Sequence, residues 1–429
     1  MLSQLVKRVH SHHSVKVIGI AGTRGKTITA HILFDLLKTF HDRVALFSSI
    51  GYDIFTESGN DFSIHDATST DIKELLKRLV AEKVDYLILE VTSKNLKKGI
   101  YDDIKFDAGI ITNIYDDNIE YYKASAEYIN TKISFLKKFK DYSTLIFASD
   151  IENILLNHSF QLRQNIVYDT FSLQNDISNF MYLEDGIQFV IANNQVKTNT
   201  YCIYNLQNLL ASIMLLKLLL NTNINYQLLN NIRIGSGRID VLRYNGAKVV
   251  IDFSYKPDML QLSLEHFISI RKPGSRIIAV GGSQGRKNIF DRSIGKVLAK
   301  LVDIVILVPN DPKDESVEDI NMQIFKYAEN EKGVIVEDFI SDSLYQLMDK
   351  SNLIRRINTV LEHGNKPFIL FNSNNLNARY NGIDLALKLA QPNDIVYVFG
   401  KGGQQYMEME NAKQKWSDYD TIFSMINAR

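Results

Sequence analysis

The sequence predicts an α/β protein with two parallel-sheet domains, and two observations support this prediction. The stretch "VIGIAGTRGKTITAHILFDLLK", Val17 to Lys38, sets a glycine loop with a Lys-Thr pair between an apolar run and a helical pattern. Short apolar runs then alternate with amphipathic stretches along the chain, which is typical of parallel strands joined by helices. With 429 residues, the chain is too long for one ordinary core and fits two or three domains.

The glycine loop lies where a strand would end and a helix would begin. After it, apolar residues recur on one helical face: Ile28, Ile32, Leu33, Leu36 and Leu37. Free N–H groups at the helix start, the helix dipole and the Lys26 ammonium face one spot, which suits a polyphosphate with magnesium. The longer pattern G-x-x-x-x-G-K-[ST] would need a glycine where Ile20 stands. The loop itself is Gly22-Thr23-Arg24-Gly25-Lys26-Thr27.

Four further apolar runs in the first half predict strands: "VALFSS", "YLILEV", "AGIITNI" and "TLIFAS". Two of them end in polar groups, at the edge where an α/β sheet holds its ligand. Glu90 closes one strand, and Asn113 followed by the Asp116-Asp117-Asn118 turn closes another. A carboxylate at a strand end beside a phosphate loop is a reasonable magnesium ligand, so we interpret Glu90 in this way.

The second half of the chain predicts a second α/β domain. All six prolines lie between Pro257 and Pro392, and the glycines Gly235 and Gly237 suggest a boundary. Strands are predicted at "KVVIDF", "RIIAVGG", "IVILVP", "FILFN" and "IVYVFG", with helices such as "VEDINMQIFKYA" between them. We therefore expect a lead segment at 1–13, a first domain at 14–233 and a second at 234–429.

Composition excludes several classes of protein. The formal net charge is zero and there is no basic tail, so nothing points to nucleic acid or to an anionic membrane. We find no apolar run of the ~18 residues that a membrane span needs. The single cysteine, Cys202, excludes an internal disulfide framework and fits a reducing compartment such as the cytoplasm. We interpret the histidines of "RVHSHHS" as a solvated lead-in rather than a metal site.

The order of these motifs resembles the Mur ligase superfamily, most closely the ligases that add the third amino acid to UDP-N-acetylmuramoyl-dipeptide. "GTRGKT" is similar to the ATP loop of that family, "EVTSKNL" to its Glu-Val-Ser-Ser-His-x-Leu, and "EYINTKISFL" to its Tyr-x-x-x-Lys segment. Farther on, "YNLQN" resembles the Asn-x-x-Asn adenine site, "SGRID" the Gly-Arg hinge, and "VVIDFSYKPDML" the Val-Asp-Tyr-Ala-His-Thr-Pro-Asp segment. "VPNDPKDES" is similar to Asp-Asn-Pro-Arg and "VFGKGGQQY" to Gly-Lys-Gly-His-Glu. The motifs are colinear from about Val15 to Tyr406.

The resemblance implies a P-loop ATP-binding domain, a Rossmann-like C-terminal α/β domain, and ATP-dependent amide formation. ATP would phosphorylate the carboxylate of a peptide or amino-acid donor, and the amine of an amino-acid acceptor would displace the phosphate. Catalysis is expected from Lys26, Glu90 and Lys132. The resemblance also implies carbamylation of Lys132, which would turn a cation into an anion that holds a metal.

The resemblance assigns the remaining site residues by group. ATP contacts are implied for Gly22, Thr23, Arg24, Gly25, Lys26, Thr27, Asn205, Asn208, Arg238 and Asp252. Mg²⁺ ligands are implied for Thr27, Glu90, Asn118 and Lys132. Substrate contacts are implied for Thr68, Ser69, Thr92, Arg286, Asn310, Lys313 and Gln404.

The chain departs from the family pattern at several positions. Asn118 replaces a metal-binding histidine, and Lys94 and Tyr255 replace two more histidines. Lys313 stands in place of the arginine of Asp-Asn-Pro-Arg, and Gln404 in place of the glutamate of Gly-His-Glu. Residues expected to handle ATP are mostly kept, whereas those expected to choose the amino acid are mostly changed. Only about 14 residues precede the first strand, so we expect no N-terminal UDP-binding domain and no UDP site of the usual kind.

Two alternatives to a peptide-type ligase are open at this point. A polymer-forming relative, such as a poly-γ-glutamate or cyanophycin-type synthetase, would also lack a UDP-binding domain. A catalytically degenerate paralogue that binds ATP and serves a regulatory role is favoured by Asn118. Formation of ADP with a new amide would support either ligase, and nucleotide binding without turnover would support the paralogue.

Overall fold

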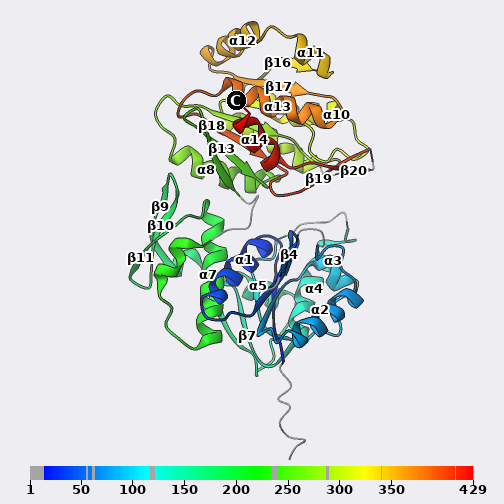
Figure 1. Cartoon of the computed structure of the whole chain (residues 1–429), viewed down its shortest axis with the longest axis vertical. Helices are drawn as coiled ribbons and strands as arrows, with labels where there is room; N and C mark the ends of the chain where they lie inside the picture. Colours follow the sequence, from blue (N-terminus) through cyan, green and yellow to red (C-terminus); the bar gives the residue numbers. More distant parts are fainter. Residues whose placement is uncertain are drawn as a thin grey trace, which may run out of the picture. The chain divides into compact units, whose positions relative to one another are not determined.

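The computed structural model of the chain describes residues 14–54, 57–59, 63–115, 121–232, 239–286, 289–339, 341–410 and 412–428. The predicted lead segment, Asn118, Arg238 and the glycines at 235 and 237 lie outside these residues. The chain divides into two compact units, each with its own sheet (Figure 1). Unit 1 comprises Met1–Met181, Asp185–Thr200 and Tyr204–Ile234, and unit 2 comprises Tyr182–Glu184, Tyr201–Ile203 and Gly235–Arg429.

Unit 1 is built on an eight-stranded sheet. In spatial order its strands are β4 (Glu57–Gly59), β3 (Gly51–Ile54), β2 (Val44–Ser48), β5 (Tyr86–Glu90), β1 (Lys16–Ala21), β6 (Phe106–Ile111), β7 (Phe139–Ala148) and β8 (Val167–Phe171). Six strands that are neighbours in space, in the order β2-β5-β1-β6-β7-β8, pair in parallel. The four predicted runs are confirmed as β2, β5, β6 and β7. The sheet is not purely parallel, because β2–β3 and β3–β4 are antiparallel pairs at one edge.

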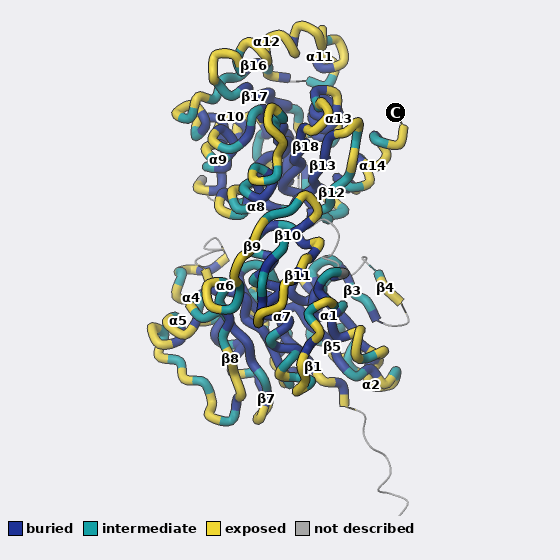
Figure 2. The backbone as a smooth tube through the Cα atoms, turned by 90° about the vertical axis from the view of Figure 1, so that its left-hand side faces the viewer, coloured by how far each residue is buried: buried dark blue, intermediate teal, exposed yellow. Residues whose placement is uncertain are grey.

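Helices cover this sheet, and its central strands β2, β5, β1 and β6 are buried along most of their length (Figure 2). The helical elements of unit 1 are α1 (Lys26–Lys38), α2 (Ser69–Ala81), α3 (Ser93–Lys97), α4 (Ser125–Ile133), η2 (Ser134–Lys138), α5 (Ile151–Asn157), α6 (Leu173–Asp176), α7 (Ile203–Leu220) and η3 (Tyr226–Asn231). The predicted apolar face of α1 is confirmed, since all five of its residues are buried.

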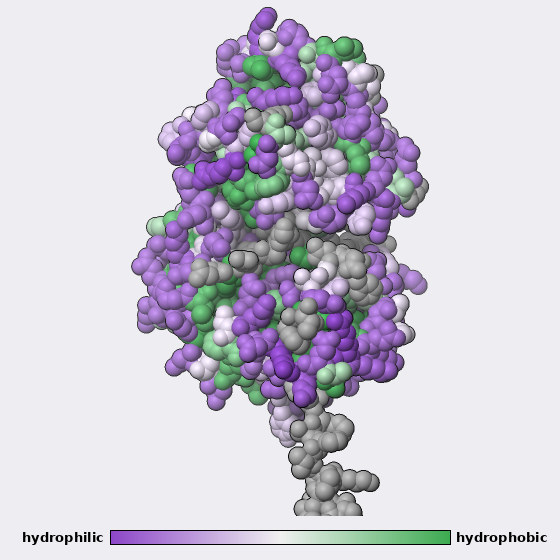
Figure 3. Space-filling view, viewed as in Figure 1, coloured by the Kyte–Doolittle hydropathy of each residue, from purple (hydrophilic) through white to green (hydrophobic). Residues whose placement is uncertain are grey.

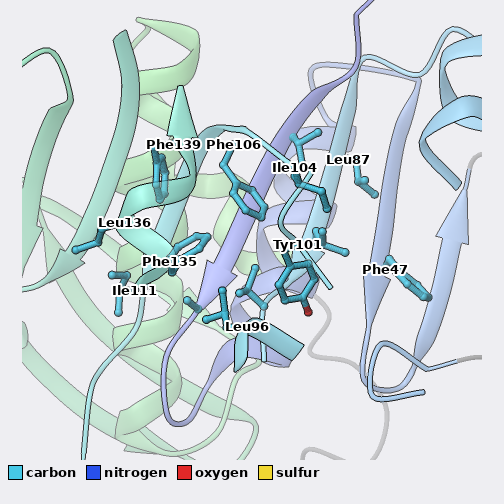
Figure 4. Close-up of a cluster of buried hydrophobic side chains, with 14 of the residues drawn as sticks. Phe47, Leu87, Leu96, Tyr101, Ile104, Phe106, Ile111, Phe135, Leu136 and Phe139 are labelled. Carbon is cyan, nitrogen blue, oxygen red and sulfur yellow. The ribbon is translucent and has the colours of Figure 1, made fainter. Parts of the chain in front are cut away.

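Aromatic packing explains a glycine in the central strand β1. Phe106, Phe135 and Phe139 form a buried cluster, with ring centroids 4.9–6.0 Å apart (Figure 4). A Cβ at Gly19 would lie 2.7 Å from the Phe135 ring and 2.8 Å from the Phe106 ring. Any side chain at this position would therefore displace the rings that pack β1 against η2, immediately before the glycine loop.

Helix α7 bears on the expectation that no apolar run is long enough to span a membrane. Its 18 residues have a mean hydropathy of 1.5, so by length and composition alone it could cross a membrane. Ten of its residues are buried inside the protein, and Ser212 donates hydrogen bonds to the carbonyls of Asn208 and Thr29. A helix that is apolar nearly all round is typical of a domain core, and α7 is such a helix. It follows a small sheet of β9 (Ile177–Leu183), β10 (Gly186–Ile191) and β11 (Asn194–Thr198).

Unit 2 is built on a seven-stranded sheet. In spatial order its strands are β12 (Asp240–Tyr244), β13 (Ala247–Asp252), β18 (Ile395–Phe399), β14 (Ile277–Gly281), β15 (Ile304–Leu307), β17 (Lys366–Phe371) and β16 (Gly333–Phe339). Only the edge pair β12–β13 is antiparallel within this sheet as described, and the five predicted runs are confirmed as β13, β14, β15, β17 and β18. A separate hairpin consists of β19 (Tyr406–Met409) and β20 (Ala412–Lys415).

The helical elements of unit 2 are α8 (Pro257–Ser269), η4 (Ile289–Ser293), α9 (Ile294–Leu301), α10 (Val317–Glu329), α11 (Asp342–Leu347), α12 (Lys350–Glu362), α13 (Leu376–Leu389) and α14 (Asp418–Asn427). The predicted helix "VEDINMQIFKYA" is confirmed as α10. On the molecular face in Figure 3, hydrophilic side chains predominate and the apolar ones lie in small separate areas, which is ordinary for a protein surface.

A fully buried histidine lies on α8. Nδ1 of His266 accepts a hydrogen bond from the Cys202 N–H at 3.3 Å, and Nε2 lies 3.2 Å from the Leu183 carbonyl oxygen, to which it donates. This pairing requires the neutral imidazole, because a proton on Nδ1 would face another N–H group. Burial lowers the pKa of His266 to about 4, despite the bond to Leu183.

The depressed pKa predicts that the protein loses stability in acid. Between pH 6.5, the ordinary pKa of histidine, and pH 4, the approximate pKa of His266 in the folded protein, this residue is protonated in the unfolded chain but neutral in the folded chain. The free energy of unfolding should therefore fall by about 3 kcal/mol from about pH 7.5 to about pH 4 through this residue. Urea titrations should show a shallower fall in His266→Gln, which cannot titrate. Equal slopes in both proteins would contradict the assignment.

Candidate active site

The predicted phosphate loop joins β1 to α1 and is a tight turn. Gly25 precedes α1 with a left-handed φ of 78°, a conformation that glycine adopts without strain. A Cβ at this position would also lie 2.3 Å from Oδ1 of Asn208 on α7. The first N–H groups of α1 have no acceptor within the helix, and the positive end of its dipole points the same way. The loop therefore has the geometry of an anion site.

Polar groups after β6 brace this loop. The Asn113 side chain accepts a hydrogen bond from the Arg24 N–H at 2.9 Å and donates one to the Arg24 carbonyl at 3.2 Å. The backbone carbonyl of Asn113 accepts a hydrogen bond from the Thr23 N–H. Thr112 Oγ1 also donates to the Arg24 carbonyl, and the Tyr115 N–H donates to Thr23 Oγ1 at 3.0 Å. Asn113, expected at this sheet edge, thus holds the loop in shape.

Glu90 lies at the carboxyl end of β5, only 2% exposed. Its Oε2 accepts hydrogen bonds from Thr27 Oγ1 at 3.0 Å and from the Ser49 N–H at 2.9 Å. The hydroxyls of Thr27 and Ser49 are themselves 2.9 Å apart. The strand order β2-β5-β1 therefore brings a carboxylate and two hydroxyls together beside Lys26.

Electrostatics keep Glu90 ionised. Burial alone would raise its pKa, but Lys26, His65 and the hydrogen bonds from Ser49 and Thr27 together lower the pKa below its ordinary value. An ionised carboxylate with two neighbouring hydroxyls is a set of hard oxygen donors, which suits Mg²⁺. No group of three or more His, Cys, Asp or Glu side chains that could hold a metal occurs among the described residues.

Lys132, on α4, lies against the phosphate loop. It is 3% exposed, its Nζ donates to the Gly22 carbonyl at 2.5 Å, and it lies 4.9 Å from the centre of the Tyr128 ring. The Tyr128 hydroxyl in turn donates to Thr23 Oγ1 at 3.1 Å. A buried lysine is unusual, so its position at this loop sets it apart from a surface helix lysine.

The asparagine pair of the predicted adenine site approaches the loop through Asn208. Asn205 and Asn208 stand one turn apart on α7, and both are buried. Asn208 Nδ2 donates to Asn205 Oδ1 at 3.2 Å, while Asn208 Oδ1 faces Gly25. Unit 1 thus brings together the loop, Glu90, Lys132 and the asparagine pair.

Three predicted substrate residues of unit 1 lie at helix starts. Thr68 and Asp71 form a capping box at the start of α2, whose first residue is Ser69. Thr92 caps α3 by accepting from the Asn95 N–H at 3.2 Å. These bonds explain the local conformation, and the substrate role of the three residues stays a prediction.

In unit 2 the loops after β14, β15 and β18 meet at Asp311. Its carboxylate accepts from Lys401 Nζ at 2.6 Å, from the Glu408 N–H at 2.8 Å and from Gln284 Nε2 at 3.2 Å. Lys401 is 1% exposed, and burial lowers its pKa although Asp311 opposes the shift. The parallel order β18-β14-β15 places these three loops at one edge of the sheet.

Two residues predicted to contact the amino-acid acceptor lie in the loops around Asp311, and each has a side-chain oxygen without a hydrogen-bond partner among the described residues. Asn310 Nδ2 donates to the Gly282 carbonyl at 3.0 Å, but its buried Oδ1 accepts nothing there, and the same holds for Oε1 of Gln404. Lys313 pairs through its backbone with Glu408, at 3.1 Å. Arg286 forms an exposed ion pair with Asp314, 2.6 Å between Nη2 and Oδ2.

Asp252 is buried at the end of β13, and its carboxylate serves unit 2 itself. Oδ2 accepts from Ser263 Oγ at 2.9 Å and from the Tyr397 hydroxyl at 2.5 Å. These contacts hold α8 and β18 together. Its contact with a nucleotide stays a prediction.

Several residues at the site were missed by sequence reasoning. Ser49 and His65 approach Glu90, Tyr128 contacts the phosphate loop, and Lys401 neutralises Asp311. Ser49 could have been found as the polar residue that follows the strand "VALFS", but only the strand order shows that it neighbours Glu90. His65 carries no such signal in the sequence. Tyr128 and Lys401 lie in the motif stretches "EYINTKISFL" and "VFGKGGQQY", but no role was assigned to either residue.

Comparison with known proteins agrees with this geometry. The family described as Mur ligase middle domain matches residues 20–216, and the Mur ligase, glutamate ligase domain matches residues 237–364. A UDP-N-acetylmuramoyl-L-alanyl-D-glutamate–2,6-diaminopimelate ligase of Fusobacterium nucleatum is 26% identical over 412 residues, 94% of this chain and 76% of that protein. A UDP-N-acetylmuramyl-tripeptide synthetase of Borreliella afzelii is 24% identical, over 96% of this chain and 77% of its own.

Solved structures share the fold. A UDP-N-acetylmuramoyl-L-alanyl-D-glutamate–2,6-diaminopimelate ligase superposes with a TM-score of 0.62 at 18% identity, covering 99% of this chain and 81% of its own. A MurF ligase from Thermotoga maritima in complex with ADP gives 0.58 at 17% identity, covering 90% and 83%. The two domain families match in the order of the two units and together span most of the sequence, so the chain belongs to the Mur ligase family.

Proposed function

We propose that this chain uses the phosphate-loop site of unit 1 to activate a carboxylate with ATP and Mg²⁺, and that an amino-acid amine then forms the amide. That the chain is an ATP-dependent amide-forming ligase follows from its family. The observation that supports the site is Glu90, ionised and bonded to Thr27 beside Lys26. Thr27 and Glu90 would hold the magnesium ion, which neutralises phosphate charge when bound.

The residues of this chain have separate tasks in the proposed reaction. Lys26 and the N–H groups that open α1 would hold the phosphates and stabilise charge on the transferred phosphoryl group. Asn205 and Asn208 would hold the adenine, because Asn208 lies against the same loop and donates a hydrogen bond to Asn205. The amine nitrogen attacks the acyl phosphate, phosphate leaves from the tetrahedral intermediate, and the nitrogen loses a proton. The products are an amide, ADP and phosphate.

The test is product analysis. The protein would be incubated with ATP, Mg²⁺, candidate donor peptides and a pool of amino acids, and the products separated by mass spectrometry. ADP together with a new amide of matching mass is the expected result. Nucleotide binding without turnover in every combination would count against a ligase and favour the regulatory paralogue. Repeated addition of one amino acid would instead indicate a polymer-forming synthetase.

We further propose that the loops around Asp311 read the far end of the acceptor. In place of an arginine fork, Lys313 offers only a point charge, so a distal carboxylate would lose bidentate recognition. The side-chain oxygens of Asn310 and Gln404, which have no partner within the described ranges, can only accept hydrogen bonds. A smaller or singly charged acceptor whose far end donates hydrogen bonds fits this arrangement better than diaminopimelate, the substrate named for several relatives.

This arrangement predicts discrimination against diaminopimelate. Two matched contacts are lost, and each hydrogen bond to a charged group is worth about 1.5–3 kcal/mol. Lys313→Ala and Gln404→Ala should raise KM for the acceptor more than KM for ATP in steady-state kinetics. The double change Lys313→Arg with Gln404→Glu should improve the use of diaminopimelate. Efficient use of diaminopimelate by the natural sequence, or equal effects on both KM values, would show that the acceptor is read elsewhere.

A further inference from the structure

A buried arginine joins two loops of unit 2 at the edge of the sheet that carries Asp311. Arg379 is the fourth residue of α13, and its side chain is 0% exposed. Its Nη1 donates to the Pro309 carbonyl at 3.0 Å, and its Nη2 donates to the Phe399 carbonyl at 3.0 Å. Pro309 lies two residues beyond β15, and Phe399 is the last residue of β18. One guanidinium therefore holds the chain where two strands end.

Strand β14 separates these two strands in the sheet and pairs with both of them. It ends at Gly281, and beyond that point the loops after β15 and β18 come into contact. A Cβ at Gly400 would lie 2.5 Å from Nδ2 of Asn310. Backbone pairing thus fixes each strand relative to β14, whereas Arg379 ties the starts of the two loops to one another.

The guanidinium is itself held by a carboxylate. Nε of Arg379 donates to Oδ1 of Asp418 at 2.8 Å, and Nη2 donates to Oδ2 at 2.7 Å. Trp416 Nε1 also donates to Oδ1, at 2.8 Å, and the Asp418 side chain is 0% exposed. Desolvation offsets much of the attraction in a buried ion pair, so apolar residues of similar volume are often as stable. We therefore expect this pair to orient the guanidinium more than it raises the free energy of unfolding.

The two loops are those to which the proposed function assigns the acceptor. Asn310 and Asp311 directly follow the Pro309 carbonyl, and Lys401 and Gln404 lie just beyond β18. The ion pair of Lys401 with Asp311 spans the two loops, with 2.6 Å between Nζ and Oδ1. A ligand read from both sides depends on the spacing of the loops, and a misplacement of about 1 Å can cost about 10²-fold in rate.

We propose that Arg379 is a positioning residue for the amino-acid acceptor: by holding the Pro309 and Phe399 carbonyls, it sets the spacing between the loop of Asn310 and the loop of Gln404. The inference rests on the proposed function, in which these loops read the far end of the acceptor. Arg379 is buried beneath the loops and does not itself touch the acceptor. Its removal should weaken acceptor recognition without affecting ATP, which the proposed function places at unit 1.

The first measurement needs no substrate and follows hydrogen exchange of the full chain by mass spectrometry. In Arg379→Met, peptides covering 309–315 and 400–408 should exchange at least about tenfold faster. The N–H groups of Lys313 and Glu408 report on the loops, because both donate hydrogen bonds between 311–313 and the hairpin that follows β18. Peptides of β14 should be unchanged. Unchanged exchange in both loops would overturn the proposal whatever the kinetics show.

The matched control is Arg276→Met. Arg276 uses the same fork, because its Nη2 donates to Oδ2 of Asp394 and to the Leu389 carbonyl, both at 2.7 Å. These groups lie at the opposite edge of the same sheet, where β14 and β18 begin. Arg276→Met should destabilise the fold while leaving exchange in 309–315 and 400–408 within about twofold. An equal effect of both changes on these loops would show a general loss of packing and contradict the positioning role.

The second measurement is ADP release at saturating ATP and donor peptide, with the standard amino acids and diaminopimelate titrated in turn as acceptors. Arg379→Met should raise the acceptor KM about tenfold or more and leave the ATP KM within about twofold. Arg379→Lys keeps a positive charge opposite Asp418 but lacks the planar fork, so it should regain thermal stability without regaining the acceptor KM. Parallel recovery of both, or an equal rise in the two KM values, would indicate a purely structural role.

Gln404→Ala separates this inference from the proposed function. If Gln404→Ala raises the acceptor KM and Arg379→Met does not, the positioning role is overturned and the loops keep the acceptor. If Gln404→Ala has no effect while Arg379→Met loosens the loops, the acceptor assignment fails, and the role proposed for Arg379 fails with it. Should Arg379→Met not fold, combining it with Asp418→Leu and Trp416→Phe replaces the whole buried pair by apolar groups, and the same outcomes decide.

Discussion

Lys26→Ala is expected to abolish ATP turnover while leaving the fold intact. The Lys26 ammonium belongs to the phosphate loop, where Nζ donates to the Thr23 carbonyl at 3.1 Å and lies close enough to Glu90 to lower its pKa. It contributes charge more than packing, because it is only partly buried. Removing one preorganised charge from a phosphoryl-transfer site costs at least about 10²-fold in rate.

The measurement is ADP release under saturating ATP, with thermal unfolding as a check on the fold. Lys38→Ala is the matched control. Lys38 is the last residue of the same helix, and its ammonium lies over the ring of Phe34. It should retain turnover within about twofold. Turnover of Lys26→Ala within a few-fold of the natural sequence would remove the loop from the mechanism.

The local part of the site could be predicted from the sequence, because its signals are contiguous. The loop between Ala21 and Lys26, the strand that ends in Glu90 and the asparagine pair on α7 each depend on fewer than about 20 residues of chain. The partners of Glu90 could not be predicted. Ser49 approaches it because β2 neighbours β5, and strand order depends on how the whole sheet assembles.

The loops around Asp311 likewise have a part that could be predicted from the local sequence and a part that could not. The sequence marked Asp311 as part of a substrate loop, but its ion pair with Lys401 joins residues 90 positions apart. That contact requires β18 and β15 to lie on either side of β14. Likewise, hydropathy alone cannot distinguish a membrane span from α7, whose Asn205, Asn208 and Ser212 find their hydrogen bonds inside unit 1. In both cases the deciding contacts are long-range.

Lys132 is expected to be carbamylated in the active enzyme, and Lys132→Arg is expected to be inactive. The buried amine would lose a proton and add carbon dioxide, and the resulting carbamate is an anion that could hold a metal ion beside the phosphate loop. Arginine keeps the positive charge and can still donate to the Gly22 carbonyl, but it cannot become that anion. If the only task of Lys132 were to brace Gly22, Lys132→Arg would retain much of the activity.

Three measurements distinguish these roles of Lys132. Activity should fall when bicarbonate is stripped from the buffer and return when it is added. A carbamate signal should appear in carbon NMR after labelling with ¹³C-bicarbonate, and Lys132→Arg should lack it. The matched control is Lys138→Arg. Lys138 forms an ion pair with Asp102, with 2.7 Å between Nζ and Oδ1, and arginine can keep this pair. This variant should keep its activity, its bicarbonate dependence and the signal. Full activity without bicarbonate, or in Lys132→Arg, would show that Lys132 acts as an unmodified ammonium that braces the loop.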